Sequence, residues 1–264
     1  MPFGVQTRTF FLLGRFRVQA AGRVMPVAEA RKVQELLGYL LVFRERTHHR
    51  EALADLLWSG ATHDQSRKYL RQALWRLQTT VRTPSAAQPL LLVEPDWIRI
   101  NPDAGIWLDV SEVESAAALA RGTRGVDLDS QLAHTLDGAS GLYSGDLLEG
   151  WYQEWCIFER ERLKARYLGL LGKLFDYAEA HGLYEDALEY GDRILRHDRA
   201  HERTHLRMMQ LHLLAGDRTS ALRQFHHCAE VLDRELGVRP AARTIELYER
   251  IRAGVSLPAG GFTD

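Results

Sequence analysis

The stretch SRKYLRQALWRL, residues 66–77, has the pattern of a helix with one apolar face and one basic face. Leu70, Ala73 and Leu77 recur at the spacing that places side chains on one side of a helix, and Val81 continues the series. The pattern predicts a helix from about Asp64 to Val81. On a helical wheel, the opposite face carries Lys68, Gln72, Trp75 and Thr79, flanked by Arg71 and Arg76.

The basic face of this helix lacks the acidic residues that an ordinary exposed face would contain. No Asp or Glu occurs between Asp64 and Glu94, whereas the helix itself carries four cations, at Arg67, Lys68, Arg71 and Arg76. Arginine pairs with guanine edges through two parallel hydrogen bonds, and glutamine can do the same with adenine. We therefore expect a helix that enters the major groove of DNA, with a merely solvated face as the alternative.

The segments on either side of this helix predict a winged helix. Short apolar stretches broken by Gly or by a polar turn predict β-hairpins, and three-to-four-residue apolar periodicity predicts helices. The expected elements are a strand at 10–18 returning at 24–27 after Gly22, helices at 31–43, 50–58 and 64–81, and a second hairpin formed by 90–93 and 97–100. Hairpin, three helices and hairpin is the winged-helix order.

Further cations flank the first two helices. Arg31 and Lys32 begin the first helix, and Arg44, Arg46 and Arg50 surround its connection to the second. We expect these side chains to hold backbone phosphates, which fix the register of a protein on DNA without reading its sequence. Solubility is the alternative role for each of them.

Beyond Asp109 the pattern is helical and contains an internal repeat. Gly182 matches Gly216, Ala187 matches Ala221 and Leu188 matches Leu222, each 34 residues apart. This is the period of tetratricopeptide repeats, in which small residues let antiparallel helices approach closely. The sequence therefore predicts a mainly α fold with a small β component, a winged helix-turn-helix followed by a tetratricopeptide-like solenoid.

Composition predicts two domains with opposite charge. The chain has 264 residues, of which 45% are hydrophobic, and the division falls at residues 1–107 and 108–264. Residues 1–107 carry 15 Lys and Arg against 9 Asp and Glu, whereas residues 108–264 carry 19 against 26. The positive half is where a polyanion would bind. Neither a signal peptide nor a long apolar run is present, so we expect a cytoplasmic location and no membrane contact.

The sequence offers little for catalysis or metal binding. His197, His201 and His205 are spaced by four residues, but we expect His197 in the turn before the helix and no metal site. The phosphate-loop, dinucleotide, nucleophile-elbow and zinc-protease motifs are absent. Cys156 and Cys228 lie in apolar helical patterns and are expected to be buried and reduced. We predict no catalytic residues and no cofactor.

In order and spacing, several stretches resemble the Streptomyces antibiotic regulatory protein family, in which an OmpR-type winged helix precedes a bacterial transcriptional activator domain. The resemblance covers roughly residues 8–252. It is carried by LLGRFRV, RKVQELLGYLL, EALADLLW and SRKYLRQALWRL in the first half, and by WLDVSEVE, LYSGDLLEGWYQEWCIFERERL, LAGDRTSALRQFHHC and LDRELGVRP in the second.

This resemblance implies an activator that binds direct-repeat promoter elements in double-stranded DNA as a side-by-side pair and contacts RNA polymerase. By position it places Arg67, Lys68, Arg71, Gln72, Trp75 and Arg76 on the recognition helix, and Trp97 and Arg99 on the wing. The wing tip here is Glu94-Pro95-Asp96 rather than basic or Gly-rich, which puts minor-groove contact in doubt. Larger relatives add an ATPase or sensor region, so we expect a short or truncated member.

Two other functions remain open from the sequence. The helical half is suited to a protein-interaction adaptor that binds a peptide, with the winged helix as a docking module. It is also suited to a regulator gated by a small effector, for which no specific motif occurs. The charge division favours the DNA-binding activator over the adaptor, and we expect that activator to be a homodimer at least on DNA.

Overall fold

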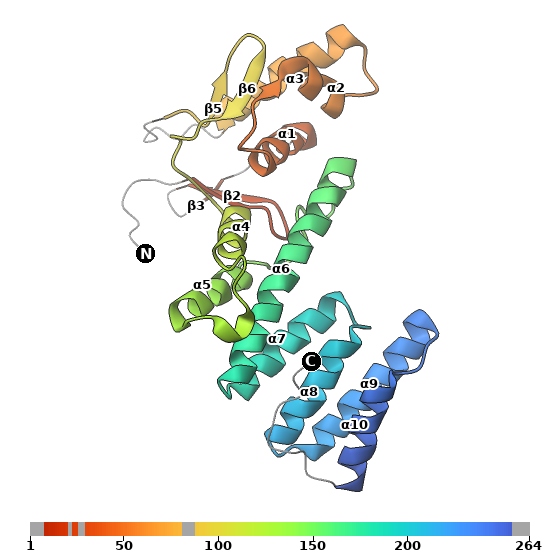
Figure 1. Ribbon diagram of the computed structural model, residues 1–264. Coiled ribbons are helices and arrows are strands. Elements are labelled where there is room, and N and C mark those ends of the chain that lie inside the picture. Colours follow the sequence, from red (N-terminus) through yellow and green to blue (C-terminus); the bar gives the residue numbers. More distant parts are fainter. Residues whose placement is uncertain (1–7, 21–22, 26–29, 81–87, 255–264) are drawn as a thin grey trace. The chain divides into compact units, whose positions relative to one another are not determined.

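The computed structural model describes residues 8–20, 23–25, 30–80 and 88–254. The chain packs as two compact units, one formed by residues 1–115 and 141–165 and the other by residues 116–140 and 166–264. The fold is mainly α with a small β component, as the sequence predicts (Figure 1). The two compact units describe how the chain packs, and they do not test the domain boundary predicted after residue 107. That boundary therefore stays a prediction.

Three helices form the centre of the first unit. They are α1 (Arg31–Val42), α2 (Arg50–Leu57) and α3 (His63–Thr80). Each agrees with its predicted range to within one residue at either end. Most of the apolar positions that predict them are buried, among them Leu36, Leu40 and Leu77, each fully inaccessible to solvent, whereas Leu56 of α2 is 45% exposed. Val81, the last predicted core position of the third helix, lies outside the described residues.

The wing is a small antiparallel sheet beside these helices. Its strands follow the order β4 (His48–His49), β6 (Trp97–Ile100) and β5 (Leu91–Val93). The predicted hairpin of β5 and β6 is confirmed. The two-residue strand β4 is not predicted, because His48 and His49 are too short a run to show alternation.

A second sheet has the order β3 (Arg23–Met25), β2 (Arg17–Ala20), β1 (Arg8–Phe11) and β7 (Ile106–Leu108). The strands β1 and β7 pair in parallel, with Phe10 opposite Leu108, and the other pairs are antiparallel. This sheet therefore joins the start of the chain to the segment that leads out of the wing.

The single strand predicted over residues 10–18 is wrong, because the chain turns between Phe11 and Arg17. The backbone N–H groups of Leu12 and Leu13 donate to the carboxylate of Asp109 instead of a neighbouring strand, at 2.8–2.9 Å. Gly14 then has a φ of +91°, which glycine adopts without strain. The predicted turn at Gly22 and the strand end at Val27 lie outside the described residues.

Residues 141–165 pack against the winged helix, although they follow it by many residues in the chain. The N–H of Gly14 donates to Asp146 and the N–H of Leu148 donates to Leu12. The indole of Trp151 lies against α1, where an added Cβ on Gly38 would be 2.9 Å from it. The guanidinium of Arg160, on α6 (Glu154–Ala180), donates to the carbonyls of Leu147, Leu148 and Trp151.

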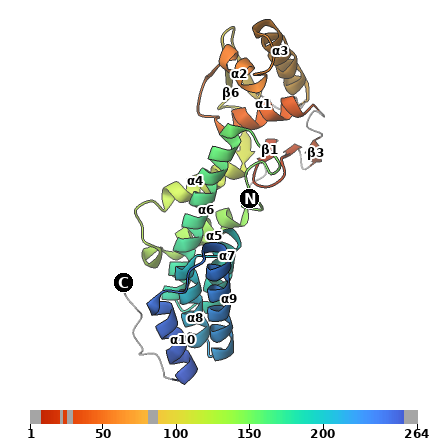
Figure 2. The same ribbon diagram turned by 90° about the vertical axis from the view of Figure 1, so that its right-hand side faces the viewer.

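The second unit is a series of helical hairpins. The connecting part of the chain forms α4 (Asp109–Leu119), a short 3-10 turn (Gly125–Asp127) and α5 (Ser130–Gly141). The later turns of α6 are followed by α7 (Tyr184–His197), α8 (Glu202–Leu214), α9 (Arg218–Leu236) and α10 (Ala242–Ala253). Each of α7 to α10 packs on the next, and both views show them side by side (Figure 2).

The tetratricopeptide-like repeat is confirmed by matching turns. Gly182 and Gly216 have φ values of +70° and +81°, and each follows a helix. After Gly182, the N–H of Leu183 donates to Ala178 at 2.9 Å. After Gly216, the N–H of Asp217 donates to His212 at 2.8 Å, so the same cap recurs one period later. Ala187 and Ala221 are both fully buried, as close helix packing requires.

Both cysteines are buried and free, as predicted. Burial raises the pKa of Cys156 to about 11 and that of Cys228 to about 12, so both remain thiols at neutral pH. None of the helices within the described residues has the length and apolar character needed to span a bilayer.

Gly38→Ala should destabilise the first unit, because the new methyl group would lie 2.9 and 3.1 Å from carbons of the buried Trp151 indole. We expect a loss of about 1–3 kcal/mol in the free energy of unfolding, measured by urea denaturation. Gly169→Ala is the matched control: it lies inside α6 with nothing within 4 Å, and should be neutral or stabilising by up to about 1 kcal/mol. Equal stability of the two variants would contradict the packing described.

Candidate nucleic-acid interface

Helix α3 is held by one apolar side and leaves its other side exposed. Leu70, Ala73, Leu74 and Leu77 are buried, and the hydroxyl of Ser66 donates to the His63 carbonyl at 2.9 Å in the first turn. The six residues predicted for the recognition helix are all exposed: Arg67, Lys68, Arg71, Gln72, Trp75 and Arg76. Trp75 is 68% exposed, so its indole is not part of a core.

Most of the polar side chains on this face have no partner within the described residues. The exceptions are Thr79, whose hydroxyl donates to the Trp75 carbonyl at 2.8 Å, and Arg67, which lies 3.7 Å from a carboxylate oxygen of Glu51, as does His63. Neither hydrogen bonds nor ion pairs engage the side chains of Lys68, Arg71, Gln72 or Arg76 in the part of the chain that the structure describes. These groups therefore remain available to a polyanion or to base edges.

Arg31 and Lys32 have an internal role that the sequence does not predict. Glu35 is 3% exposed, and its two carboxylate oxygens lie 3.2 Å from Arg31 and 2.7 Å from Lys32. Arg31 also donates to the Gly150 carbonyl at 3.3 Å. Because a buried carboxylate needs compensation, these cations are largely committed to Glu35, and a phosphate would have to share them.

Arg50 ties the wing to α2. Its backbone N–H donates to Asp96 at 2.9 Å and its guanidinium donates to the Glu94 carbonyl at 3.3 Å. The wing tip, residues 94–96, is thereby fixed against the start of α2. On β6, Arg99 is exposed and Trp97 is 44% exposed, with its ring edge-on to His49 at 5.1 Å.

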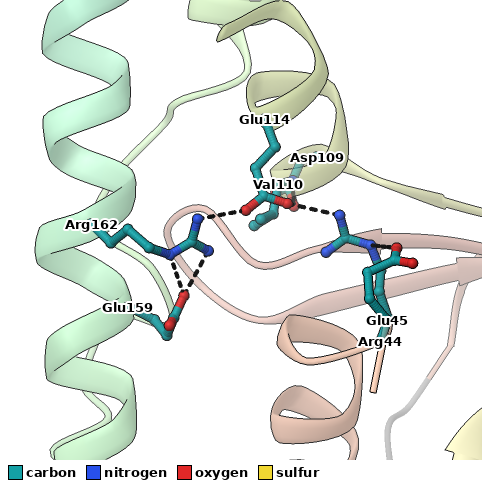
Figure 3. Close-up of polar contacts among 7 residues, drawn as sticks. All are labelled: Arg44, Glu45, Asp109, Val110, Glu114, Glu159 and Arg162. Carbon is teal, nitrogen blue, oxygen red and sulfur yellow. Dashed lines mark hydrogen bonds and ion pairs between the residues drawn. The ribbon is translucent and has the colours of Figure 1, made fainter. Parts of the chain in front are cut away.

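An ion-pair network joins the winged helix to the start of the helical region (Figure 3). The carboxylate of Glu114, on α4, lies 2.7 Å from Arg44 at the end of α1 and 2.8 Å from Arg162 on α6. Arg44 also pairs with Glu45 at 3.5 Å, and Arg162 with Glu159 at 2.6 Å. Arg44, expected to hold a phosphate, is therefore directed to a side chain of its own unit.

Asp109, the first residue of α4, also has a structural role that the sequence does not predict. It is 1% exposed and accepts hydrogen bonds from the N–H groups of Leu12, Leu13 and Val110. Burial raises the pKa of this carboxyl, although these hydrogen bonds and the charge of Arg17 oppose the shift. Asp109 and Glu114 both lie in the WLDVSEVE motif, but their partners come from distant parts of the chain, so the motif alone does not predict these contacts.

The histidines do not form a metal site within the described residues, where no group of three or more His, Cys, Asp or Glu could hold an ion. His197, expected in the turn before the next helix, is instead the last residue of α7. His205 is fully buried and shares hydrogen bonds with the Arg199 carbonyl and with Gln224, both at 2.8 Å. It belongs to the core between α8 and α9.

The comparisons with known proteins agree with this architecture. The family model described as bacterial transcriptional activator domain matches residues 108–252, more than half of the chain. The structure is similar to that of Mycobacterium tuberculosis EmbR in complex with low affinity phosphopeptide, with a TM-score of 0.72 and 19% identity over 97% of this chain and 67% of that chain. At this identity the similarity establishes the fold. No curated protein sequence matches the chain.

Glu114→Gln should weaken the fold in a pH-dependent way. Burial opposes ionisation of Glu114, but Arg44 and Arg162 outweigh it, so the pKa of the carboxyl lies below its ordinary value. A carboxyl with a lowered pKa stabilises the folded state at neutral pH, and the contribution disappears as the pH falls through that pKa. We expect Glu114→Gln to lose about 1–3 kcal/mol of unfolding free energy at neutral pH, and less in acid.

Urea denaturation at neutral and acid pH measures this difference. Glu112→Gln is the control, because Glu112 is exposed on the same helix and should change stability by less than about 0.5 kcal/mol. A Glu114→Gln deficit that is constant with pH would show that the charge of the carboxyl is not what stabilises the unit.

Proposed function

Because the chain belongs to the bacterial transcriptional activator domain family, we propose that this transcriptional activator binds direct-repeat promoter DNA through α3. The observation that carries the proposal is the exposed face of α3, where Lys68, Arg71, Gln72 and Arg76 project with no acidic neighbour from residue 65 to residue 93. The proposed activity is binding, and it uses no catalytic residue, metal or cofactor.

The contacts divide by chemistry into base readers and phosphate holders. Arg71 and Gln72 have the forked or amide groups that make paired hydrogen bonds with guanine or adenine. Lys68 and Arg76 flank them and suit phosphates, as does Arg67 once it leaves Glu51, which is itself half exposed. Arg31, Lys32 and Arg50 are weaker candidates, since each already has an internal partner.

Two copies of the chain would bind side by side on adjacent half-sites. A direct repeat has no two-fold axis, so the pair would be related by translation along the DNA rather than by the symmetry of a palindrome. The helical region, residues 108–264, would hold the pair together and contact RNA polymerase. Holding two readers on one assembly makes the second contact effectively intramolecular, which raises affinity for a double site.

Arg71→Ala and Gln72→Ala should each weaken binding to the preferred site by about 1–3 kcal/mol while affecting random DNA much less, because they lose contacts to base edges. Lys68→Ala should weaken binding to all sequences about equally and lower the salt slope by about one unit, as loss of one phosphate contact requires. Fluorescence anisotropy titrations on both DNAs over a range of salt concentrations measure these effects. Equal losses on both DNAs for Arg71→Ala and Gln72→Ala would remove α3 as the base reader.

Replacing Glu94 and Asp96 together with Lys should tighten binding to non-specific DNA, because two negative charges at the wing tip become positive beside the phosphates. The backbone of this turn is held by Arg50, so the charge can change without loss of the turn. The same titration on random DNA measures the effect. Weaker binding by the double variant would indicate that the wing tip makes a specific contact or serves a protein partner.

A further inference from the structure

Three large apolar side chains at the start of α6 and just before it are exposed within the part of the chain that the structure describes. Tyr152 is 79% exposed, Phe158 68% and Ile157 44%. The neighbouring Trp151 and Cys156 are buried, so the inward side of this segment is already packed. Large aromatic side chains exposed together are a common mark of a protein-binding surface. We call Tyr152, Ile157 and Phe158 the α6 strip.

Within the α6 strip, Ile157 and Phe158 lie on one face of α6 between two acidic residues, and Tyr152 precedes the helix. Glu154, Ile157, Phe158 and Glu161 follow the spacing of zero, three, four and seven that aligns side chains along a helix. Both glutamates are exposed, as is Glu149 in the preceding loop. Within the described residues, none of these three carboxylates forms an ion pair. The strip therefore has three carboxylates on its rim.

Three nearby arginines do not offset this rim, because they are turned inward, and the cation on the rim side of α6 is Lys164, one turn beyond Glu161. Arg160 donates to the carbonyls of Leu147, Leu148 and Trp151 at 2.9–3.3 Å. Arg162 is occupied by Glu114 and Glu159. Arg31, which reaches the Gly150 carbonyl, is paired with buried Glu35. The sequence ERER at 159–162 contains both charge signs, but both of its arginines are engaged by groups within the first unit.

We propose that the α6 strip binds a segment of a partner protein in which apolar side chains are flanked by Lys or Arg. Apolar contact would supply the affinity, and the acidic rim would select the charge of the partner. DNA does not fit this surface, since the rim would repel phosphates. A second copy of the chain could not use the basic face of α3 for this contact, because the proposed function assigns that face to DNA.

This inference rests on the proposed function, because that function places the partner protein in the transcription complex. RNA polymerase holoenzyme is therefore the probe. It is titrated against the fluorescently labelled full chain, with and without promoter DNA, and activation is measured by reconstituted transcription. The double variant Ile157→Ser with Phe158→Ser should lower polymerase affinity and activation by about tenfold or more, as loss of a central apolar contact does. Its DNA affinity and melting temperature should match the wild type.

A charge-reversal variant tests the acidic rim separately. Glu154→Lys with Glu161→Lys should produce a similar loss, because like charges would then face the basic partner. The matched controls are Leu119→Ser, which removes a side chain that is 64% exposed on α4, and Glu189→Lys, which reverses an exposed charge on α7. Both should retain wild-type affinity for polymerase.

Several results would overturn the proposal. Wild-type activation by the α6 strip variants would do so, as would failure of the wild-type chain to bind polymerase under either condition. Loss of stability or DNA affinity in the variants would show that the strip packs within the chain, and a change in self-association by sedimentation would assign it to a second copy. Because binding to polymerase is measured without DNA, failure of the DNA proposal leaves this test interpretable.

Discussion

The carboxylate of Asp109 connects the beginning of the chain to the first residue of α4, and much of the first unit depends on this connection. It accepts the N–H groups of Leu12 and Leu13, which would otherwise be buried without partners, and that of Val110 in its own helix. The strand β1 thereby ends where β7 ends, and residues 12–16 are free to turn toward the segment at 144–149. A buried donor without a partner costs about 1–3 kcal/mol, so this arrangement is strongly favoured over a longer strand.

The polar groups of the first unit divide into those that hold the unit together and those that face outward. The outward set on α3 is basic and amide-bearing, whereas the outward set at the start of α6 is apolar and acidic. The inward set includes Arg44, Arg160 and Arg162, which satisfy carboxylates or carbonyls. Net charge along the sequence does not distinguish these roles. What matters for function is which cations remain unpaired after the unit has folded.

Periodicity was enough to predict the helices and the repeat, because local spacing determines which side of a helix is buried. The limits of α3 and the turns at Gly182 and Gly216 follow from residues close to one another in the chain. The split between β1 and β2 could not be predicted in this way, since its cause, Asp109, lies about a hundred residues away. The same is true of Glu35, whose burial makes internal partners of Arg31 and Lys32. The exposed positions of the predicted recognition helix were found from pattern, but their contacts with DNA remain a proposal.

Selection of bound sequences from a random DNA pool by the purified full chain tests the central claim most directly. The account predicts enrichment of two copies of one short motif in the same orientation, with their centres separated by about one helical turn. Arg71→Ala should change the base preferred at a position within each copy. Enrichment of inverted repeats, or of no sequence at all, would contradict the account that α3 reads direct-repeat DNA.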